Sequence, residues 1–380
     1  LRSVVLSEMG LLGSRQRLVR ILVEQGDLSA AEHLLDSDSF CDECELQAQD
    51  CCNFAQIYFR CGRDCDAAVW LDRAIELDAS LLWAHRLYGW VYIRSGSPAS
   101  ALDSLERALW LDPCDAEAHF LKAEALVTLK RYRDAENAYE QALEHRPCFP
   151  EALCNYGCLL HLLGRHRDAL PLLERAVISK PEFPVALSAL GIALKQCGEL
   201  DRAAAVLEKA IDLDPSFPEA YLNLGQVLQA ETHAQIDRAE LLYCKALALR
   251  ENNPEAINNL GTLYELRGQH LLARSLYEKA LLLRPDYPQA LANLGNTYAA
   301  VGDHEKARDF YLRSIELAGD VAEFRHNLGL SYQRQGRMLE AIRAYRGAVA
   351  LSPDFIEPLW NKAFCHLYLG DYNEGWRDYE

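Results

Sequence analysis

The sequence contains no block of basic residues, no low-complexity tract and no apolar run that approaches the roughly 20 residues needed to cross a bilayer. Its 380 residues carry a formal net charge of −17. Nucleic acid and anionic lipid surfaces require dense Lys and Arg, which neutralise phosphates. We therefore predict a protein without a membrane span whose main partner is not a nucleic acid.

Gly and Pro are also sparse, at 21 and 14 residues, while 50% of the chain is hydrophobic. This composition allows a large buried core and predicts a folded protein. The first twenty residues do not resemble a secretory signal, because Glu8 and further charged residues interrupt their apolar run.

What the chain has in abundance is a repeat. Gly recurs at spacings of 34 or 36 residues, usually followed twelve residues later by Ala and four residues further by a large apolar residue. Pro stands near the end of most periods. The three series are Gly157, Gly191, Gly225, Gly261, Gly295 and Gly329; Ala169, Ala203, Ala273, Ala307 and Ala341; and Leu173, Leu207, Tyr243, Tyr277, Tyr311 and Tyr345.

Each period predicts two short antiparallel helices, because steps of three and four residues are helical and Pro stops the pair. Gly on the first helix lets the second helix approach closely. One pair cannot bury its own apolar face, so neighbouring pairs must stack. We predict an all-α fold, a right-handed superhelix of about ten or eleven helix-turn-helix units whose inner groove is lined mostly by first helices.

The stretch AHRLYGWVYIRSGSPASALDSLERALWLDP (Ala84 to Pro113) resembles the tetratricopeptide repeat, whose pattern is W-x2-L-G-x2-Y, then A-x3-F, then P. The resemblance extends over nearly the whole chain and implies stacked helix pairs that bind proteins. The predicted organisation is a degenerate N-terminal repeat with a cysteine-containing linker (1–47), nine repeats (48–81, 82–115, 116–149, 150–183, 184–217, 218–253, 254–287, 288–321 and 322–355) and a partial C-terminal repeat (356–380).

An Asn recurs two places before the small residue of the first helix. Asn costs roughly 0.6 kcal/mol relative to Ala in a helix, so its return requires a reason. One interpretation is a ladder of amides that binds the backbone of an extended peptide. The other is that each Asn bonds to an adjacent helix and sets the stacking. The predicted ladder comprises Asn155, Asn223, Asn259, Asn293, Asn327 and Asn361.

Neutral polar residues flank this ladder from residue 184 onward and indicate a wet peptide groove. The predicted groove residues are Gln226, Asn258, Thr262, Asn296 and Gln333, with Ser188 and Gln229 in the same polar set. Toward the N-terminus the same face carries Trp83, Arg86, Trp90 and Phe120. These side chains either anchor an apolar ligand side chain or pack against their neighbours, and we favour packing.

Chaperone-binding tetratricopeptide proteins clamp a terminal carboxylate with basic residues, whereas the corresponding early groove positions here are acidic. These positions are Glu117, Glu151, Glu219, Glu255, Glu323 and Glu357. The Asn ladder is instead similar to the repeat region of O-linked N-acetylglucosamine transferases, where it holds the backbone of the protein substrate. The final stretch LGDYNEGWRDYE (Leu369 to Glu380) resembles the last repeat of bacterial proteins in which the array precedes a glycosyltransferase domain.

The function predicted is a protein-interaction scaffold that binds an extended polypeptide in its groove. One alternative is the substrate-recruiting region of a protein O-glycosyltransferase whose catalytic domain lies beyond Glu380. Another is a scaffold that forms homo-oligomers. Within these residues we predict neither catalytic residues nor a cofactor, since no two carboxylates share a predicted cleft with apolar walls.

Six of the 13 cysteines fall between Cys41 and Cys65. A C-x2-C pair can bind zinc, but the adjacent Cys51 and Cys52 point in different directions from a helix. We favour small buried apolar residues over a metal site, whose candidate ligands would be Cys41, Cys44, Cys51, Cys61 and Cys65. The odd cysteine count indicates reduced thiols and a cytoplasmic location. His161 and His166 lie five residues apart, off a common helical face, and we expect them at the surface.

Overall fold

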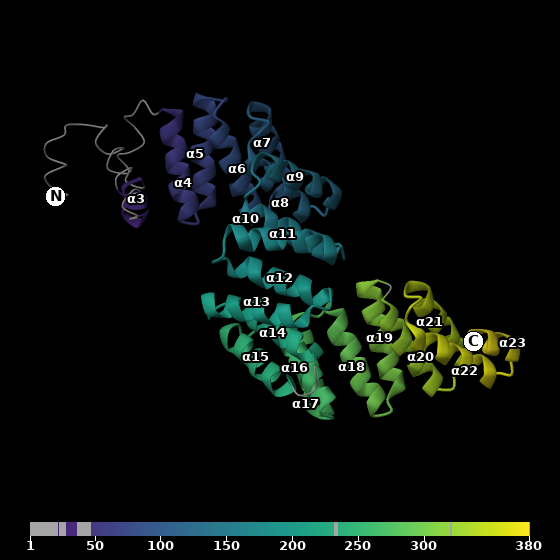
Figure 1. Cartoon of the computed structure of the whole chain (residues 1–380). Coiled ribbons are helices and arrows are strands. Elements are labelled where there is room, and N and C mark those ends of the chain that lie inside the picture. The colour runs from purple at the N-terminus through teal and green to yellow at the C-terminus, as the bar shows by residue number, and fades with distance from the viewer. Residues whose placement is uncertain (1–21, 23–27, 36–46, 232–234, 320, 380) are drawn as a thin grey trace. The chain divides into compact units, whose positions relative to one another are not determined.

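The computed structural model describes residues 22, 28–35, 47–231, 235–319 and 321–379, and every regular element among these residues is a helix (Figure 1). The predicted all-helical fold is therefore confirmed. The chain forms two compact halves, an N-terminal half from Leu1 to Glu182 and a C-terminal half from Phe183 to Glu380. In the part described, no helix is both long and apolar enough to span a bilayer.

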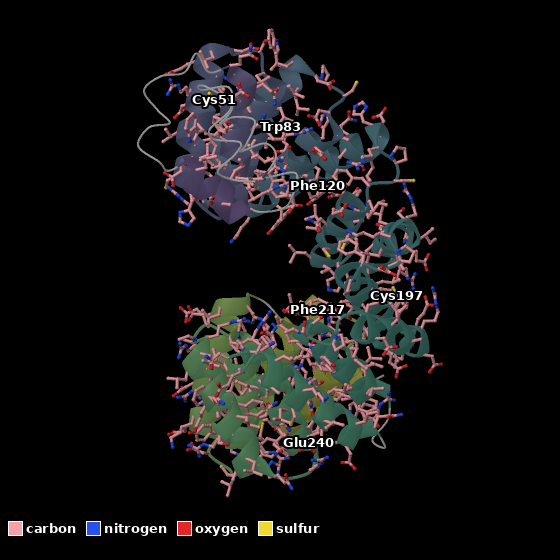
Figure 2. All side chains as sticks on the ribbon, turned by 90° about the vertical axis from the view of Figure 1, so that its left-hand side faces the viewer. Cys51, Trp83, Phe120, Cys197, Phe217 and Glu240 are labelled. Carbon is pink, nitrogen blue, oxygen red and sulfur yellow. The ribbon has the colours of Figure 1, made fainter. Side chains whose placement is uncertain are left out.

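In the N-terminal half, α3 is followed by four helix pairs, and within each pair the two helices pack tightly against each other. The helices are α3 (Leu28–Leu35), α4 (Ala48–Arg60), α5 (Asp64–Leu77), α6 (Leu82–Arg94), α7 (Pro98–Leu111), α8 (Ala116–Thr128), α9 (Tyr132–His145), α10 (Pro150–Leu162) and α11 (His166–Ser179). Cys51, Trp83 and Phe120 lie in this half (Figure 2).

The C-terminal half continues the same alternation with six pairs. They are α12 (Pro184–Gln196), α13 (Leu200–Leu213), α14 (Pro218–Glu231), α15 (Ile236–Leu249), α16 (Pro254–Leu266), α17 (His270–Leu283), α18 (Pro288–Ala300), α19 (His304–Ala318), α20 (Ala322–Arg334), α21 (Met338–Leu351), α22 (Ile356–Tyr368) and α23 (Tyr372–Tyr379). The two extra residues of the repeat at 218–253 are divided between α14, which is longer than its neighbours, and the connection to α15.

The small and large residues of the sequence pattern meet in the core of each helix pair. A Cβ placed on Gly261 would lie 2.7 Å from Cε1 of Tyr277, and one on Gly157 would lie 2.6 Å from Cγ of Leu173. Both large side chains are fully buried. The repeating Gly is therefore required by close approach between the helices, and the predicted role of the small residue is confirmed.

The turn inside each pair needs a backbone with positive φ. Gly268 fulfils this need between α16 and α17, where its φ is 72°. At the corresponding position between α8 and α9 stands Lys130, with a φ of 58°. A side chain with a Cβ is disfavoured in this left-handed region, so the α8–α9 turn carries strain that the α16–α17 turn avoids.

Candidate functional site

The first helices form the inner side of each stack. In the C-terminal half, α12, α14, α16, α18 and α20 each contact the next first helix, and in the N-terminal half α4 and α6 do the same. Successive second helices do not approach one another comparably within the described ranges. Contact on one side and separation on the other curve each stack around its first helices, and we call the concave side the inner face. The predicted groove residues lie on these first helices.

The ladder residues are engaged with the preceding repeat. Their amide Nδ2 atoms donate to side chains on the previous first helix, and His326 Nε2 is the partner in the last contact. The contacts are Asn155–Glu124 (2.9 Å), Asn223–Ser188 (2.9 Å), Asn293–Asn258 (3.0 Å), Asn327–Asn296 (3.2 Å) and Asn361–His326 (3.4 Å). This geometry corresponds to the interpretation in which Asn sets the stacking. It occupies the Nδ2 donors that would otherwise be available to a bound peptide.

Some hydrogen-bonding groups of the ladder have no partner among the described residues. The Oδ1 atoms of Asn293 and Asn327 receive no hydrogen bond from the described residues, and both side chains are half-buried. Asn259 accepts a long hydrogen bond of 3.4 Å from Asn258, while its own Nδ2 is buried without a partner among the described residues. A buried amide without a partner is costly, so Asn259 is the ladder residue whose geometry most favours an additional acceptor.

Buried tyrosines on the second helices orient the flanking amides. Tyr311 donates to Oδ1 of Asn296 (2.7 Å), and Tyr345 donates to Oε1 of Gln333 (2.6 Å). Burial raises the pKa of both phenols, so each remains a protonated donor at neutral pH. Each amide therefore turns its oxygen toward the core and its NH₂ group away from it.

Lys195 orients the side-chain amide of Gln226 in the same way, with its oxygen toward the lysine. Its Nζ lies 2.8 Å from Oε1 of Gln226. An ammonium group only donates, so the Gln226 oxygen must face it and the amide nitrogen faces away. Burial lowers the pKa of Lys195. Neither Gln226 Nε2, Gln333 Nε2 nor Asn296 Nδ2 donates to another described residue, which leaves three donors at the inner face.

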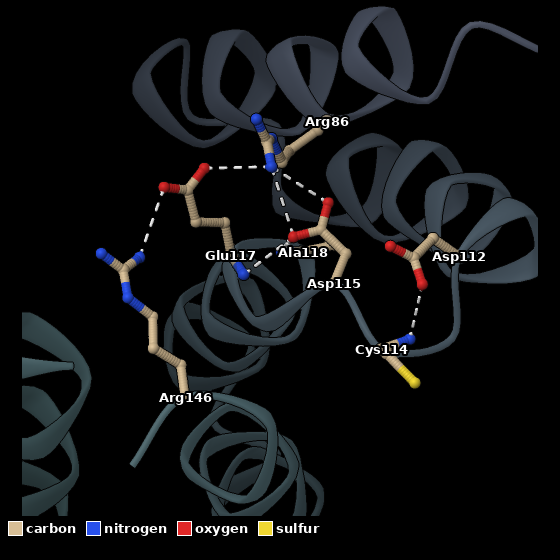
Figure 3. A network of polar contacts seen from close by, with 7 residues as sticks. All are labelled: Arg86, Asp112, Cys114, Asp115, Glu117, Ala118 and Arg146. Atoms are coloured by element: carbon tan, nitrogen blue, oxygen red, sulfur yellow. Dashed lines mark hydrogen bonds and ion pairs between the residues drawn. The ribbon is translucent and has the colours of Figure 1, made fainter. Parts of the chain in front are cut away.

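At the positions that correspond to Asn258 and Asn296, the N-terminal half carries the charged residues Arg86 and Glu124. Arg86 lies 3.1 Å from Asp115 and 3.1 Å from Glu117, which itself lies 3.6 Å from Arg146 (Figure 3). Glu124 accepts hydrogen bonds from Tyr139 and Asn155.

Four of the six early groove glutamates form ion pairs with basic residues near the end of the same repeat. The pairs are Glu117–Arg146, Glu151–Lys180, Glu219–Arg250 and Glu255–Arg284. Sequence reasoning did not predict these pairs. Their signal is a basic residue that recurs 29 or 31 places after each Glu.

The aromatic residues of the N-terminal half differ in burial. Phe120 is buried and lies 5.0 Å from Phe149 between ring centroids, which confirms core packing for this residue. Trp83 is half-buried. Trp90 is 41% exposed beside Phe59, at 6.3 Å between centroids, and therefore offers an apolar surface rather than a core contact.

The cysteines that the structure describes are dispersed. Cys51 and Cys52 are fully buried, Cys61 is half-buried and Cys65 is exposed, while Cys41 and Cys44 lie outside the described residues. Burial raises the pKa of Cys51, and it raises the pKa of Cys52 to about 12, so both thiols stay protonated at neutral pH. In the described ranges no three His, Cys, Asp or Glu side chains converge to hold a metal ion.

His161 and His166 approach each other across a turn. They lie on different helices, and the α10–α11 turn brings their Nδ1 atoms to 3.0 Å. The turn of the helix pair falls between the two residues, so they meet without sharing a helical face, and both side chains are half-buried.

Family models match successive parts of the chain. Models described as tetratricopeptide repeats match residues 125–186, 254–319 and 294–354, and one described as a TPR repeat matches 191–231. A further model, of subunit 3 of the anaphase-promoting complex (cyclosome), matches residues 61–142. The chain is a tetratricopeptide repeat protein.

Solved structures share this fold at low sequence identity. The Cut9–Hcn1 hetero-tetramer of the APC/C matches with 20% identity and a TM-score of 0.57, over 93% of this chain and 77% of that one. The human IFIT1 dimer with m7Gppp-AAAA matches with 16% identity and a TM-score of 0.57, over 96% of this chain and 93% of that one. A search of curated proteins gave no match. At these identities the likeness establishes the fold alone.

Proposed function

We propose that this protein is an interaction scaffold that holds an extended polypeptide against the inner face of its C-terminal half. The observation that carries the proposal is a set of three amide NH₂ donors, on Gln226, Asn296 and Gln333. Their oxygens are held away from the inner face by hydrogen bonds from Lys195, Tyr311 and Tyr345. Backbone carbonyls are the acceptors that every polypeptide offers, so these donors bind with little dependence on sequence.

The ladder supplies the complementary groups. The free Oδ1 atoms of Asn293 and Asn327 accept backbone N–H groups in this proposal, while their Nδ2 atoms keep the repeats in register. Packed helices lie about 8–10 Å apart, which about three residues of extended chain span. A ligand in extended conformation thus meets one set of amides for every three residues.

The test replaces the three amides by their acids, Gln226→Glu, Asn296→Asp and Gln333→Glu. Each acid keeps the oxygen that accepts from Lys195, Tyr311 or Tyr345, so the fold contacts persist while the donors are lost. The probe is a fluorescein-labelled pool of random peptides of about 15 residues, long enough for five repeats. We expect anisotropy to show binding by the native chain and at least a roughly tenfold weaker affinity for the triple variant.

A matched control adds the same charge elsewhere, through Gln141→Glu, Asn252→Asp and Gln269→Glu, all at exposed positions. This control should bind the peptide pool as the native chain does. Equal binding by both triple variants, or no binding by the native chain, would contradict the proposal. The two alternatives named from the sequence, a recruiting region of a glycosyltransferase and a homo-oligomeric scaffold, stay predictions.

A further inference from the structure

Charged residues are scarce on the inner face of the C-terminal half. Each first helix carries its inner polar residues at three positions, which lie two places before the repeating Gly, one place after it and four places after it. In the five repeats from 184 to 355 these positions are neutral except at Lys195 on α12 and Glu265 on α16. The row therefore has one cation and, two repeats further along, one anion.

The cation, Lys195, has no anionic partner among the described residues. Its ammonium group lies 2.8 Å from the neutral Oε1 of Gln226. The side chain is half-buried, and burial lowers the pKa of Lys195 with no nearby carboxylate to oppose it. A partly desolvated cation without a counter-ion is costly, so a carboxylate of a bound ligand stabilises it.

The anion, Glu265, is also half-buried, and no Lys or Arg of the described residues pairs with it. Its Oε2 accepts a hydrogen bond of 2.7 Å from Tyr277. Burial raises the pKa of Glu265, whereas the Tyr277 hydrogen bond and the charge of the exposed His270 lower it. The Oε1 atom receives no hydrogen bond from the described residues, so it is available to a cationic group of a ligand.

We propose that the polypeptide held by this face carries an acidic side chain opposite Lys195 and a basic side chain opposite Glu265. This inference rests on the proposed function and names the class of polypeptide. Two steps between neighbouring first helices amount to about 16–20 Å, which five or six residues of extended chain span. Side chains of an extended chain alternate between its two faces, so an even spacing is required. A spacing of about six residues meets both conditions.

The experiment compares fluorescein-labelled peptides of about 15 residues in a background of Ser, Ala and Gln. One kind carries a Glu and a Lys about six positions apart, made in both orders because the chain can run in either direction. A second kind has Gln at both positions, and a third has the Glu and the Lys side by side. None of these peptide sequences has a net side-chain charge, so the net charge of −17 on the protein does not favour one of them. We expect anisotropy to show at least about fivefold tighter binding for one order of the spaced pair.

Two substitutions assign the preference to its residues. Lys195→Gln still offers a donor to Gln226, and Glu265→Gln still offers an oxygen to Tyr277, so only the charges are lost. In Lys195→Gln, exchange of the peptide Glu for Gln should no longer change the affinity. In Glu265→Gln, the same should hold for exchange of the peptide Lys.

The matched controls are Lys209→Gln on α13 and Glu316→Gln on α19, which remove the same charges at exposed positions of second helices. Both should keep the preference of the native chain for the spaced pair. The preference should also fall in about 0.5 M NaCl, since salt screens charges that are partly exposed.

The outcomes separate this inference from the proposed function. Equal binding of the spaced, adjacent and neutral peptides would overturn the inference and leave the proposed function intact. A preference that persists in both Lys195→Gln and Glu265→Gln would overturn it as well, because the charges would then act at another surface. If the native chain binds none of the peptides, the proposed function fails and the inference fails with it.

Discussion

The two halves stack their helix pairs in the same way but connect successive first helices through different side chains. Three residues before the small residue of the first helix, the N-terminal half has Arg86, which pairs with Asp115 and Glu117 at the start of the next repeat. At the same position the C-terminal half has Asn258, which accepts from Asn293 of the next repeat. One contact is between ions and the other is between neutral amides.

A second pair of positions repeats the contrast. Glu124 accepts from Tyr139 and from Asn155, and Asn296 accepts from Tyr311 and from Asn327. The geometry is shared, and the charge is not. Because the buried small and large residues fix how the helices approach, the polar residues at these positions are free to vary, from the ions of Arg86 and Glu124 to the neutral amides of Asn258 and Asn296.

The largest expected effect comes from Arg86→Met. Asp115 is only 7% exposed and also caps α8 through the backbone N–H groups of Glu117 and Ala118. Removal of Arg86 leaves a nearly buried carboxylate without its cation, which should lower the free energy of unfolding by about 2–4 kcal/mol. Urea denaturation monitored by circular dichroism measures the change.

The matched control for this prediction is Arg238→Met, whose partner Glu208 is 48% exposed. Its cost should stay below about 1 kcal/mol, because exposed pairs are screened by water. Equal costs for the two substitutions would remove the distinction between a buried and an exposed ion pair.

A smaller effect is expected from Asn293→Ala in the C-terminal half. This change leaves the Oδ1 of the buried Asn258 without its donor and should cost about 1–2 kcal/mol. The comparison between the halves becomes sharper in about 1 M NaCl, where the share of the Arg86→Met cost that arises from Glu117, which is 44% exposed, should fall and the cost of Asn293→Ala should not. Asn252→Ala, at an exposed position, should change stability little. Equal salt dependence of the two costs would mean that the inner faces do not differ electrostatically.

The sequence predicted the fold well, because the fold depends on residues whose type is itself informative. Residues of the types of Gly261, Ala273 and Tyr277 recur at fixed offsets. Ala273 and Tyr277 are fully buried, and Gly261 lies against the Tyr277 ring, as the pattern predicted. The roles of the polar residues could not be deduced in the same way. An Asn at a fixed place predicts an inner position, but whether its amide faces the previous repeat or a ligand depends on partners such as Ser188 and Asn296, which have no common residue type.

Some site features depended on contacts that are distant along the chain. Lys195 fixes Gln226, which lies 31 residues further along the chain, and no local pattern indicates this bond.

The smallest expected effect tests whether the halves also differ in backbone strain. Lys130 and Gly268 occupy the same turn position, with φ values of 58° and 72°. Lys130→Gly should stabilise the N-terminal half by about 0.5–1 kcal/mol, because Gly adopts this backbone without a Cβ penalty. Gly268→Ala should destabilise the C-terminal half by a similar amount, although a Cβ there would meet no atom within 4 Å. Because the space is open, any loss at Gly268 reports backbone strain alone. Urea denaturation of both variants checks the pair, and changes of the same sign would show that the strain at Lys130 is compensated within its own turn.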